Sequence, residues 1–440
     1  MKNYKYLIPI LLVVLMGAGI YSTLSTAGNK KNEYVSYIKE ARKMAELDVV
    51  DDALADYRKA LDIRDTIDIS LEVGQLYVDH EWISESISWG EYLVEHFPKE
   101  PKAYTFLLQR YMDTKQYDDC FKLQKQAQAR DAQNQEFSDL MQSIQYIYEL
   151  GYDEYDDVGT FSGGYCAVED EGLWGYVGVT GNTKIKAQFQ WAGVFSADDV
   201  APVQDTEGNY YYIADTGNKK IALQNLQKCT ALGASIGGVL PAAEDGVFNY
   251  YDQEFNIVIK DDTGFDYATP INGGIAAVNK NNAWFLMDNQ GKRLTKDDYD
   301  GFILDEKGIA YRNDRAFARK GDQIVMINSS GEEIGNQSYD DADLFFQANS
   351  YAAVKSGGKW GFIDADGKTM IEPQYEEARS FSNGYAAVKS DGKWGFIDTN
   401  GQLVIDCQFD GAKDFNSHGC VFVNTNGKWQ MLALKKDNYS

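Results

Sequence analysis

Hydrophobic and polar residues alternate along two nearly identical stretches near the C-terminus. Residues 384–405 read GYAAVKSDGKWGFIDTNGQLVI, and residues 351–371 read YAAVKSGGKWGFIDADGKTMI. Because successive side chains of a strand point to opposite faces, Tyr385–Lys389 and Lys393–Asp398 are expected to form strands. Both faces carry apolar residues, which predicts sheets covered on both sides, and the glycine-containing stretches between them are typical of tight turns. Each unit therefore predicts a meander of three or four short antiparallel strands.

The position of Trp394 recurs through the second part of the chain. The equivalent residues are Trp174, Tyr210, Phe248, Trp284, Ile324, Trp360, Trp394 and Trp429, spaced 36, 38, 36, 40, 36, 34 and 35 residues apart. A small sheet that is apolar on both faces cannot stand alone and must stack against its neighbours. We expect the recurring aromatic rings to form the core between sheets. Gly395, inside a strand, indicates close approach of another backbone or a large ring.

The sequence KWGFID occurs at Lys359–Asp364 and Lys393–Asp398, and LWGY occurs at Leu173–Tyr176. These segments resemble the repeats of bacterial WG-repeat proteins. The resemblance covers about Tyr155–Leu434. It implies an all-β repeat domain; an eight-bladed β-propeller is favoured and an open β-solenoid is the alternative.

The last repeat lacks a final strand, and the first repeat is preceded by residues that could supply it. Gly151–Glu154 precedes Tyr155 as Ile405–Gln408 precedes Phe409. In a closed ring, Gly151–Tyr155 should pair with Lys428–Leu434 and join the first repeat to the last. This pairing would leave no open sheet edge.

Residues 34–150 instead show the apolar spacing of three and four that predicts helices, the last of them over Gln135–Leu150. Apolar, aromatic and small residues recur at matching positions about 34 residues apart: Gly74, Tyr77 and Ser86 correspond to Leu108, Tyr111 and Cys120. This segment resembles the tetratricopeptide family. The resemblance implies a curved helical stack whose concave face binds protein or peptide segments; a simple helical spacer is the other interpretation.

An uncharged apolar run, Leu7–Leu24, follows Lys2 and Lys5. Its length favours an N-terminal transmembrane helix, although Ser25–Ala27 would also suit cleavage of a signal peptide. We therefore expect a multidomain α+β chain: residues 1–30 as membrane anchor or signal, 31–150 as a tetratricopeptide-like helical domain and 151–440 as the WG-repeat domain. The expected location is the cell membrane with a single span and the bulk outside the cytoplasm, or secretion if the signal is cleaved.

The formal net charge of −25 argues against nucleic-acid binding, because phosphate contacts need basic surface. The five cysteines are scattered without a CxxC pair, and the three histidines form no metal or catalytic pattern. Turns such as Asp398–Gly401 lack the glutamate that a calcium loop places after its glycine. We predict no catalytic, cofactor or metal site.

Two groups of residues are candidates for partner binding. Tyr211 and Tyr251 lie in tyrosine runs where strand alternation should turn one ring outward. The other group is a basic cluster in an acidic domain, formed by Arg312, Arg315 and Arg319. The sequence favours a membrane-anchored, non-enzymatic protein-binding scaffold at the bacterial cell surface. A carbohydrate-binding surface module is the alternative, followed by an enzyme acting on sugars.

Overall fold

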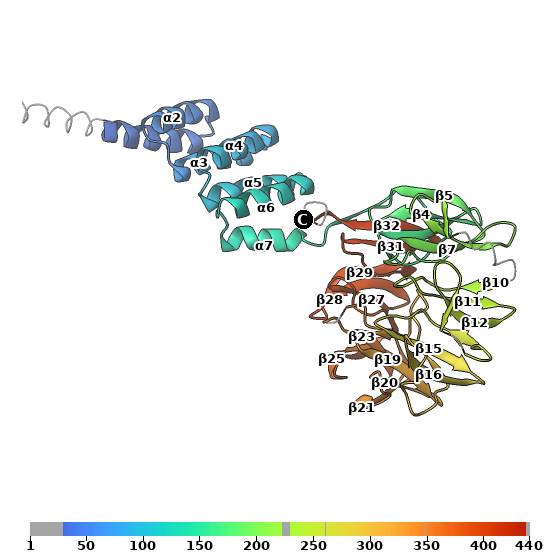
Figure 1. The fold of residues 1–440 in the computed structure, drawn as a ribbon. Coiled ribbons are helices and arrows are strands. Elements are labelled where there is room, and N and C mark those ends of the chain that lie inside the picture. Colours follow the sequence, from blue (N-terminus) through green and yellow to red (C-terminus); the bar gives the residue numbers. More distant parts are fainter. Residues whose placement is uncertain (1–29, 222–228, 260, 348, 437–440) are drawn as a thin grey trace, which may run out of the picture. The chain divides into compact units, whose positions relative to one another are not determined.

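The computed structural model describes residues 30–221, 229–259, 261–347 and 349–436, and it divides the chain between Ile147 and Tyr148 into two compact units (Figure 1). The first unit is helical and the second is built from strands. The predicted transmembrane helix, and the single-pass membrane location that depended on it, find no support. Within the described ranges, no helix is both long and apolar enough to cross a bilayer. The apolar run Leu7–Leu24 itself lies outside the described residues.

The helical unit is a series of antiparallel helices with a regular period. Residues 30–46 are helical, and the helices that follow are α2 (Val50–Ile63), α3 (Ile67–Asp79), α4 (Ile83–His96), α5 (Pro101–Asp113), α6 (Tyr117–Ala129) and α7 (Gln135–Ile144). The starts of α3, α5 and α7, at residues 67, 101 and 135, are 34 residues apart. This is the period that the sequence indicated.

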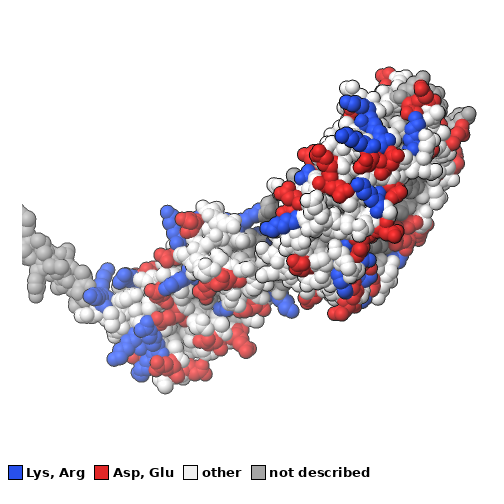
Figure 2. Space-filling model, turned by 90° about the horizontal axis from the view of Figure 1, so that it is seen from below, with Lys and Arg blue, Asp and Glu red and all other residues white. Residues whose placement is uncertain are grey.

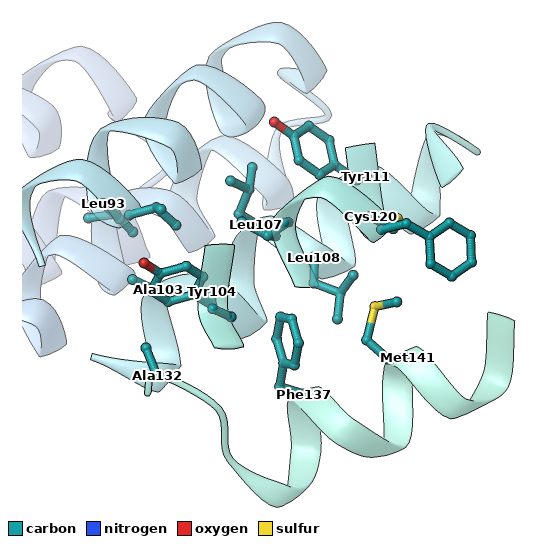
Figure 3. Packing of buried hydrophobic residues seen from close by; sticks show 14 of the residues in the cluster. Leu93, Ala103, Tyr104, Leu107, Leu108, Tyr111, Cys120, Ala132, Phe137 and Met141 are labelled. Carbon is teal, nitrogen blue, oxygen red and sulfur yellow. The ribbon is translucent and has the colours of Figure 1, made fainter. Parts of the chain in front are cut away.

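Close packing between these helices depends on small residues and on two apolar clusters, one from Ile38 to Tyr77 and one from Leu93 to Ile144. A Cβ added at Gly74 would lie 2.6 Å from the ring of Phe106, so a larger residue here would require that ring to shift. Figure 3 shows Leu108 of α5 facing Phe137 and Met141 of α7. The prediction of a helix over Gln135–Leu150 is wrong at its end: α7 stops at Ile144, and strand β1 (Tyr148–Leu150) follows.

The second unit is an eight-bladed β-propeller, and among the described residues each blade is one antiparallel sheet of three to five strands. The first four blades contain β2 (Asp157–Val158), β3 (Tyr165–Asp170), β4 (Leu173–Gly178), β5 (Thr183–Phe189); β6 (Trp191–Ala192), β7 (Val200–Gln204), β8 (Tyr210–Ala214), β9 (Lys219–Ile221); β10 (Cys229–Leu232), β11 (Leu240–Glu244), β12 (Val247–Tyr251), β13 (Ile257–Ile259); and β14 (Tyr267–Ala268), β15 (Ile275–Lys280), β16 (Ala283–Asp288).

The remaining four blades complete the ring (Figure 1). They contain β17 (Gly301–Phe302), β18 (Tyr311–Arg312), β19 (Arg315–Lys320), β20 (Gln323–Ile327), β21 (Glu333–Tyr339); β22 (Asp341–Ala342), β23 (Ala352–Ser356), β24 (Lys359–Ile363), β25 (Thr369–Tyr375); β26 (Glu377–Ala378), β27 (Tyr385–Ser390), β28 (Lys393–Asp398), β29 (Leu403–Phe409); and β30 (Gly411–Ala412), β31 (Cys420–Thr425), β32 (Lys428–Leu434), the last joined by β1.

The ring is closed by a strand from the start of the unit, as predicted. Strand β1 pairs with β32, with Tyr148 opposite Leu434 and Leu150 opposite Leu432. The pairing continues past β1, because Tyr155 and Trp429 exchange two backbone hydrogen bonds of 2.9 Å. The first and last blades also share an apolar cluster that includes Val168. The closing strand begins three residues earlier than expected, and the open solenoid is excluded.

The recurring tryptophan position is only half-buried, so the prediction that it forms the core between blades is wrong in detail. Trp394 packs at the edge of an apolar cluster, and the Lys389 ammonium lies 5.9 Å from its ring centre. The fully buried ring belongs to Phe396, two residues further along the strand. Residues two apart lie on the same face of a strand, so Trp394 and Phe396 share one face. The repeat pattern therefore identified the buried face correctly, but the residue it singled out, Trp394, is the less buried of the two.

The glycine of each Trp-Gly pair accommodates a bulge in the neighbouring outer strand. Trp394 is paired with Phe409 and Phe396 with Ile405, so three residues of β29 lie opposite Gly395 alone. A Cβ added at Gly395 would lie 2.5 Å from the Ile405 carbonyl oxygen and 2.7 Å from the Cys407 nitrogen. Gly175 and Gly361 meet the same backbone contact in their own blades. The expected close approach of another backbone is confirmed.

Replacing Gly395 with alanine should therefore lower the free energy of unfolding by about 1–3 kcal/mol, because the contact is with backbone that cannot rotate away. Gly159→Ala is the matched control, since its added Cβ would lie at an ordinary 3.7 Å from Ala167. Chemical denaturation of both variants measures the difference. Equal stabilities would contradict this role of the Trp-Gly glycine.

Candidate functional site: the charged channel of the propeller

A long loop of the fifth blade lies at the centre of the ring. Residues 303–314 connect Phe302 of β17 to β19, whereas only residues 379–384 make the equivalent connection in the seventh blade. Glu306 of this loop accepts hydrogen bonds from Arg379 (3.0 Å) and Lys413 (3.1 Å), which belong to the seventh and eighth blades. Residues 306–308 also share a cavity of 220 Å³ with Gly193 and Gly233 of the second and third blades. A loop that reaches blades on both sides of the ring occupies the channel.

The loop keeps its shape through an aspartate turn. The Asp305 carboxylate oxygen Oδ1 accepts hydrogen bonds from the backbone N–H groups of Lys307 (2.8 Å) and Ile309 (2.9 Å). Gly308 has a φ of +74°, a conformation that glycine adopts without strain. This turn places Glu306 and Lys307 at the tip of the loop.

Opposite the loop, an arginine and an aspartate of neighbouring blades form a two-point ion pair. Arg379 donates from Nε to Asp414 Oδ1 at 2.8 Å and from Nη2 to Asp414 Oδ2 at 2.7 Å. Burial alone would raise the pKa of Glu306, but Arg379 and Lys413 lower it overall. Glu306 and Arg379 therefore stay charged, and their contacts with Lys413 and Asp414 link the loop to the seventh and eighth blades.

Two other ionisable groups of the channel, Asp343 and Lys307, have fewer interactions with groups of opposite charge. Burial raises the pKa of Asp343 to about 6, helped by nearby Asp414 and opposed by Arg379. The Asp343 carboxylate accepts backbone hydrogen bonds of 2.9 Å from Ser380 and Leu344, and it forms no salt bridge to a described side chain. Burial lowers the pKa of Lys307, and the adjacent Arg312 lowers it further.

The basic cluster predicted from the sequence is divided between three places. Arg312 lies in the channel, where its Nη2 is 2.7 Å from Asp305 Oδ2. Arg315 donates from Nε to the carbonyl of Ala365 (2.8 Å) in the next blade. Arg319 is exposed on β19. Only Arg312 of these three lines the channel, so the structure does not bring them together as one patch.

The predicted tyrosines are placed within the blades rather than on a shared surface. Tyr251 is 4% exposed and stacks on Phe255, with ring centres 4.1 Å apart, while Tyr250 beside it is fully buried. Alternation therefore does not turn a ring outward at this pair. Tyr211 is half-buried, and the Lys219 ammonium lies 3.8 Å from its ring centre.

The helical unit has a cavity of its own that sequence analysis did not find. Its 220 Å³ lie between the end of α3, the start of α4 and the end of α5. Tyr77 and Trp82 form an aromatic wall, with ring centres 5.9 Å apart, and Ile83 beside them is 58% exposed. Arg110 and Asp113 lie at the same cavity and pair with each other at 2.8 Å.

Two other kinds of reactive group, metal ligands and cysteine thiols, can be assessed in the part of the chain that the structure describes. No group of three or more histidine, cysteine or acidic residues could hold a metal ion there. Burial raises the pKa of the Cys120 thiol to about 12 and that of Cys229 to about 11. These thiols are therefore protonated at neutral pH and poorly nucleophilic.

Comparison with protein families agrees with the repeat pattern of the propeller. The model of the WG containing repeat matches residues 154–174, 174–210, 250–284, 326–360, 360–394 and 394–429. These six matches lie in the propeller unit and cover most of it. The chain is a WG-repeat protein.

Comparison with other proteins gives only distant likeness. No curated protein matches the chain. Among solved structures, Hsv2p of Kluyveromyces lactis is 11% identical with a TM-score of 0.37, covering 57% of this chain and 92% of that chain. Hsv2 of Kluyveromyces marxianus is 13% identical with a TM-score of 0.33, covering 62% of this chain and 88% of that chain. Similarity at this level does not define a shared function.

Removing the buried Asp414 should destabilise the propeller strongly, because the partly buried Arg379 would be left with one carboxylate partner instead of two. We expect Asp414→Ala to cost about 3 kcal/mol in the free energy of unfolding. Glu377→Ala is the control, since Glu377 pairs with Lys389 at 2.6 Å on the exposed surface and should cost less than about 1 kcal/mol. Similar losses in the two variants would show that the channel pair is not a structural link.

Asp343 should make the free energy of unfolding increase as the pH falls from 7 to 5. Its folded pKa of about 6 lies above the ordinary 3.8, so the folded state binds the proton more tightly. Stability from this group therefore increases as the pH falls from 7 to 5, by about 1 kcal/mol. Denaturation at both pH values should show that Asp343→Asn lacks this increment. An unchanged pH dependence would exclude the raised pKa.

Proposed function

We propose that this protein is a non-enzymatic protein-binding scaffold whose helical unit takes an apolar side chain of a partner segment. The observation that carries the proposal is the cavity beside Tyr77, Trp82 and Ile83. An isoleucine that is 58% exposed at the edge of a preformed aromatic cavity offers apolar area that a partner could bury.

The character of this cavity suits a protein segment. Its aromatic wall supplies rigid apolar contact, and protein interfaces are centred on such aromatic anchors. The charged side chains of Arg110 and Asp113 supply polar groups at the same place, where interfaces place their rim. The resemblance of the helical repeats to the tetratricopeptide family supports the same use, because that family binds protein segments.

The charges on the surface favour recognition of a partner through short-range contacts rather than through long-range electrostatic attraction. Basic and acidic side chains are interspersed on the face seen in Figure 2, although the whole chain carries a formal charge of −25. An exposed mixture of charges gives little long-range attraction at physiological ionic strength. Recognition would then depend on contacts such as those of the helical cavity.

Replacing Ile83 with aspartate should abolish capture of the partner, because a charge would be buried in the apolar contact. The full chain and its variants would serve as bait, with captured proteins identified by mass spectrometry. Leu47→Asp is the control, since Leu47 is 60% exposed in the same unit but outside the cavity. A partner retained equally by both variants would contradict the proposal.

A second candidate function is carbohydrate binding, and one propeller cavity favours it. Trp191 (38% exposed) and Tyr267 (37% exposed) line the 220 Å³ cavity that reaches the channel loop. Partly exposed rings of this kind could stack on sugars. Retention of the full chain on a polysaccharide column, lost in Trp191→Ala, would favour this function over the scaffold.

A further inference from the structure

One end of the propeller channel opens into a cavity of 360 Å³, called here the channel-end cavity. It is lined mainly by the loops between the first and second strands of the first, sixth, seventh and eighth blades, which all emerge at one end of the ring. Lys307 and Arg312 of the long fifth-blade connection complete it. This volume is within the range of small-ligand sites in proteins.

The two cations of the channel-end cavity have fewer partners than the neighbouring channel cations: Arg312 pairs with Asp305, and Lys307 has no ion pair with a described side chain. Arg379 and Lys413 both hydrogen-bond to carboxylates. No ion pair or hydrogen bond joins the Lys307 ammonium to any described side chain, although Lys307 lines both the channel-end cavity and the 220 Å³ cavity beside Gly193 and Gly233.

Arg312 also has a guanidinium N–H group without a hydrogen-bond partner among the described residues. Its guanidinium is 2.7 Å from Asp305, yet neither its buried Nε nor Asp305 Oδ2 has a hydrogen-bond partner within the described structure. The ring of Phe346 lies 5.8 Å from the guanidinium carbon. The guanidinium therefore has hydrogen-bonding capacity that the described part of the chain leaves unused.

We propose that the channel-end cavity binds a carboxylate group, with Lys307 and Arg312 as the donors. Lysine and arginine donate strong charge-assisted hydrogen bonds to a carboxylate, and the arginine fork matches its shape. Polar side chains of Ser162, Asn383 and Ser417 also line the cavity and could contact the rest of such a ligand.

The charges around the cavity favour a carboxylate over a phosphate. Asp414 lines the same cavity, and Asp305 lies against Arg312. A phosphate carries close to two negative charges at neutral pH and would be repelled by both carboxylates. A carboxylate brings one charge and would relieve the mutual repulsion of Lys307 and Arg312. The site is separate from the helical cavity and does not depend on it.

The carboxylate could belong to a free small acid or to an acidic side chain of a peptide. Calorimetric titration of the full chain with glutarate, with a short blocked peptide containing one glutamate and with inorganic phosphate separates these cases. We expect at least one carboxylate probe to bind, and phosphate to bind more weakly. Binding of both probes would indicate a free acid, and binding of the peptide alone would indicate a peptide source.

Lys307→Met should weaken binding of the carboxylate probe at least tenfold. Arg319→Gln is the matched control, because it removes one positive charge from the exposed surface of the same blade. If the Lys307→Met protein does not fold, Lys307→Gln is measured in its place. The proposal is overturned if neither carboxylate binds the unaltered chain, if phosphate binds as tightly, or if Lys307 and Arg319 variants bind alike.

Discussion

The pairing of β1 with β32 is the constraint on which the propeller depends. Eight sheets that are apolar on both faces have no stable end unit, because the first and last would each expose one face. The strand before the first repeat joins the last blade, and the bridge between Tyr155 and Trp429 continues the connection. Once the first and last blades meet, every blade has two neighbours. The channel and its charged groups exist only because the ring is closed.

Closure also explains why small residues and charged residues line opposite sides of the channel. The residues that follow the first strand are glycines in the first three blades, Gly159, Gly193 and Gly233, whereas the seventh and eighth blades place Arg379 and Lys413 there. The long loop of the fifth blade lies between these two sides. Its Glu306 neutralises the cations on one side, and its Gly308 shares a cavity with the small residues on the other. One insertion therefore fills the channel and orders its charges.

Most of the architecture could be predicted because it is repeated in the sequence. The alternating pattern around Trp394 and the turn glycines predicted the strands, and the missing last strand predicted closure. The depth of burial could not be predicted, because Trp394 and Phe396 point to the same face and only the neighbouring blade decides which ring is enclosed. Likewise, Tyr250 and Tyr251 are both buried because each face of their strand is covered.

The channel site was largely hidden from the sequence. Arg312 was identified by its charge, but Glu306, Arg379 and Asp414 come from separate repeats and meet only when the ring closes. One signal was present: the spacing of 40 residues between Trp284 and Ile324 is the longest of the series and contains the channel loop. A repeat period shows where a chain departs from its pattern, but it does not show where the extra residues lie.

Amide hydrogen exchange at the closing strand tests the closed ring most directly. The backbone N–H groups of Gly151, Tyr155 and Trp429 donate to carbonyls across the junction at 2.7–2.9 Å. If the ring is closed as described, these amides should exchange as slowly as those in the centre of a blade such as β27, through opening of the whole propeller. Rapid exchange at all three, while β27 stays protected, would contradict closure.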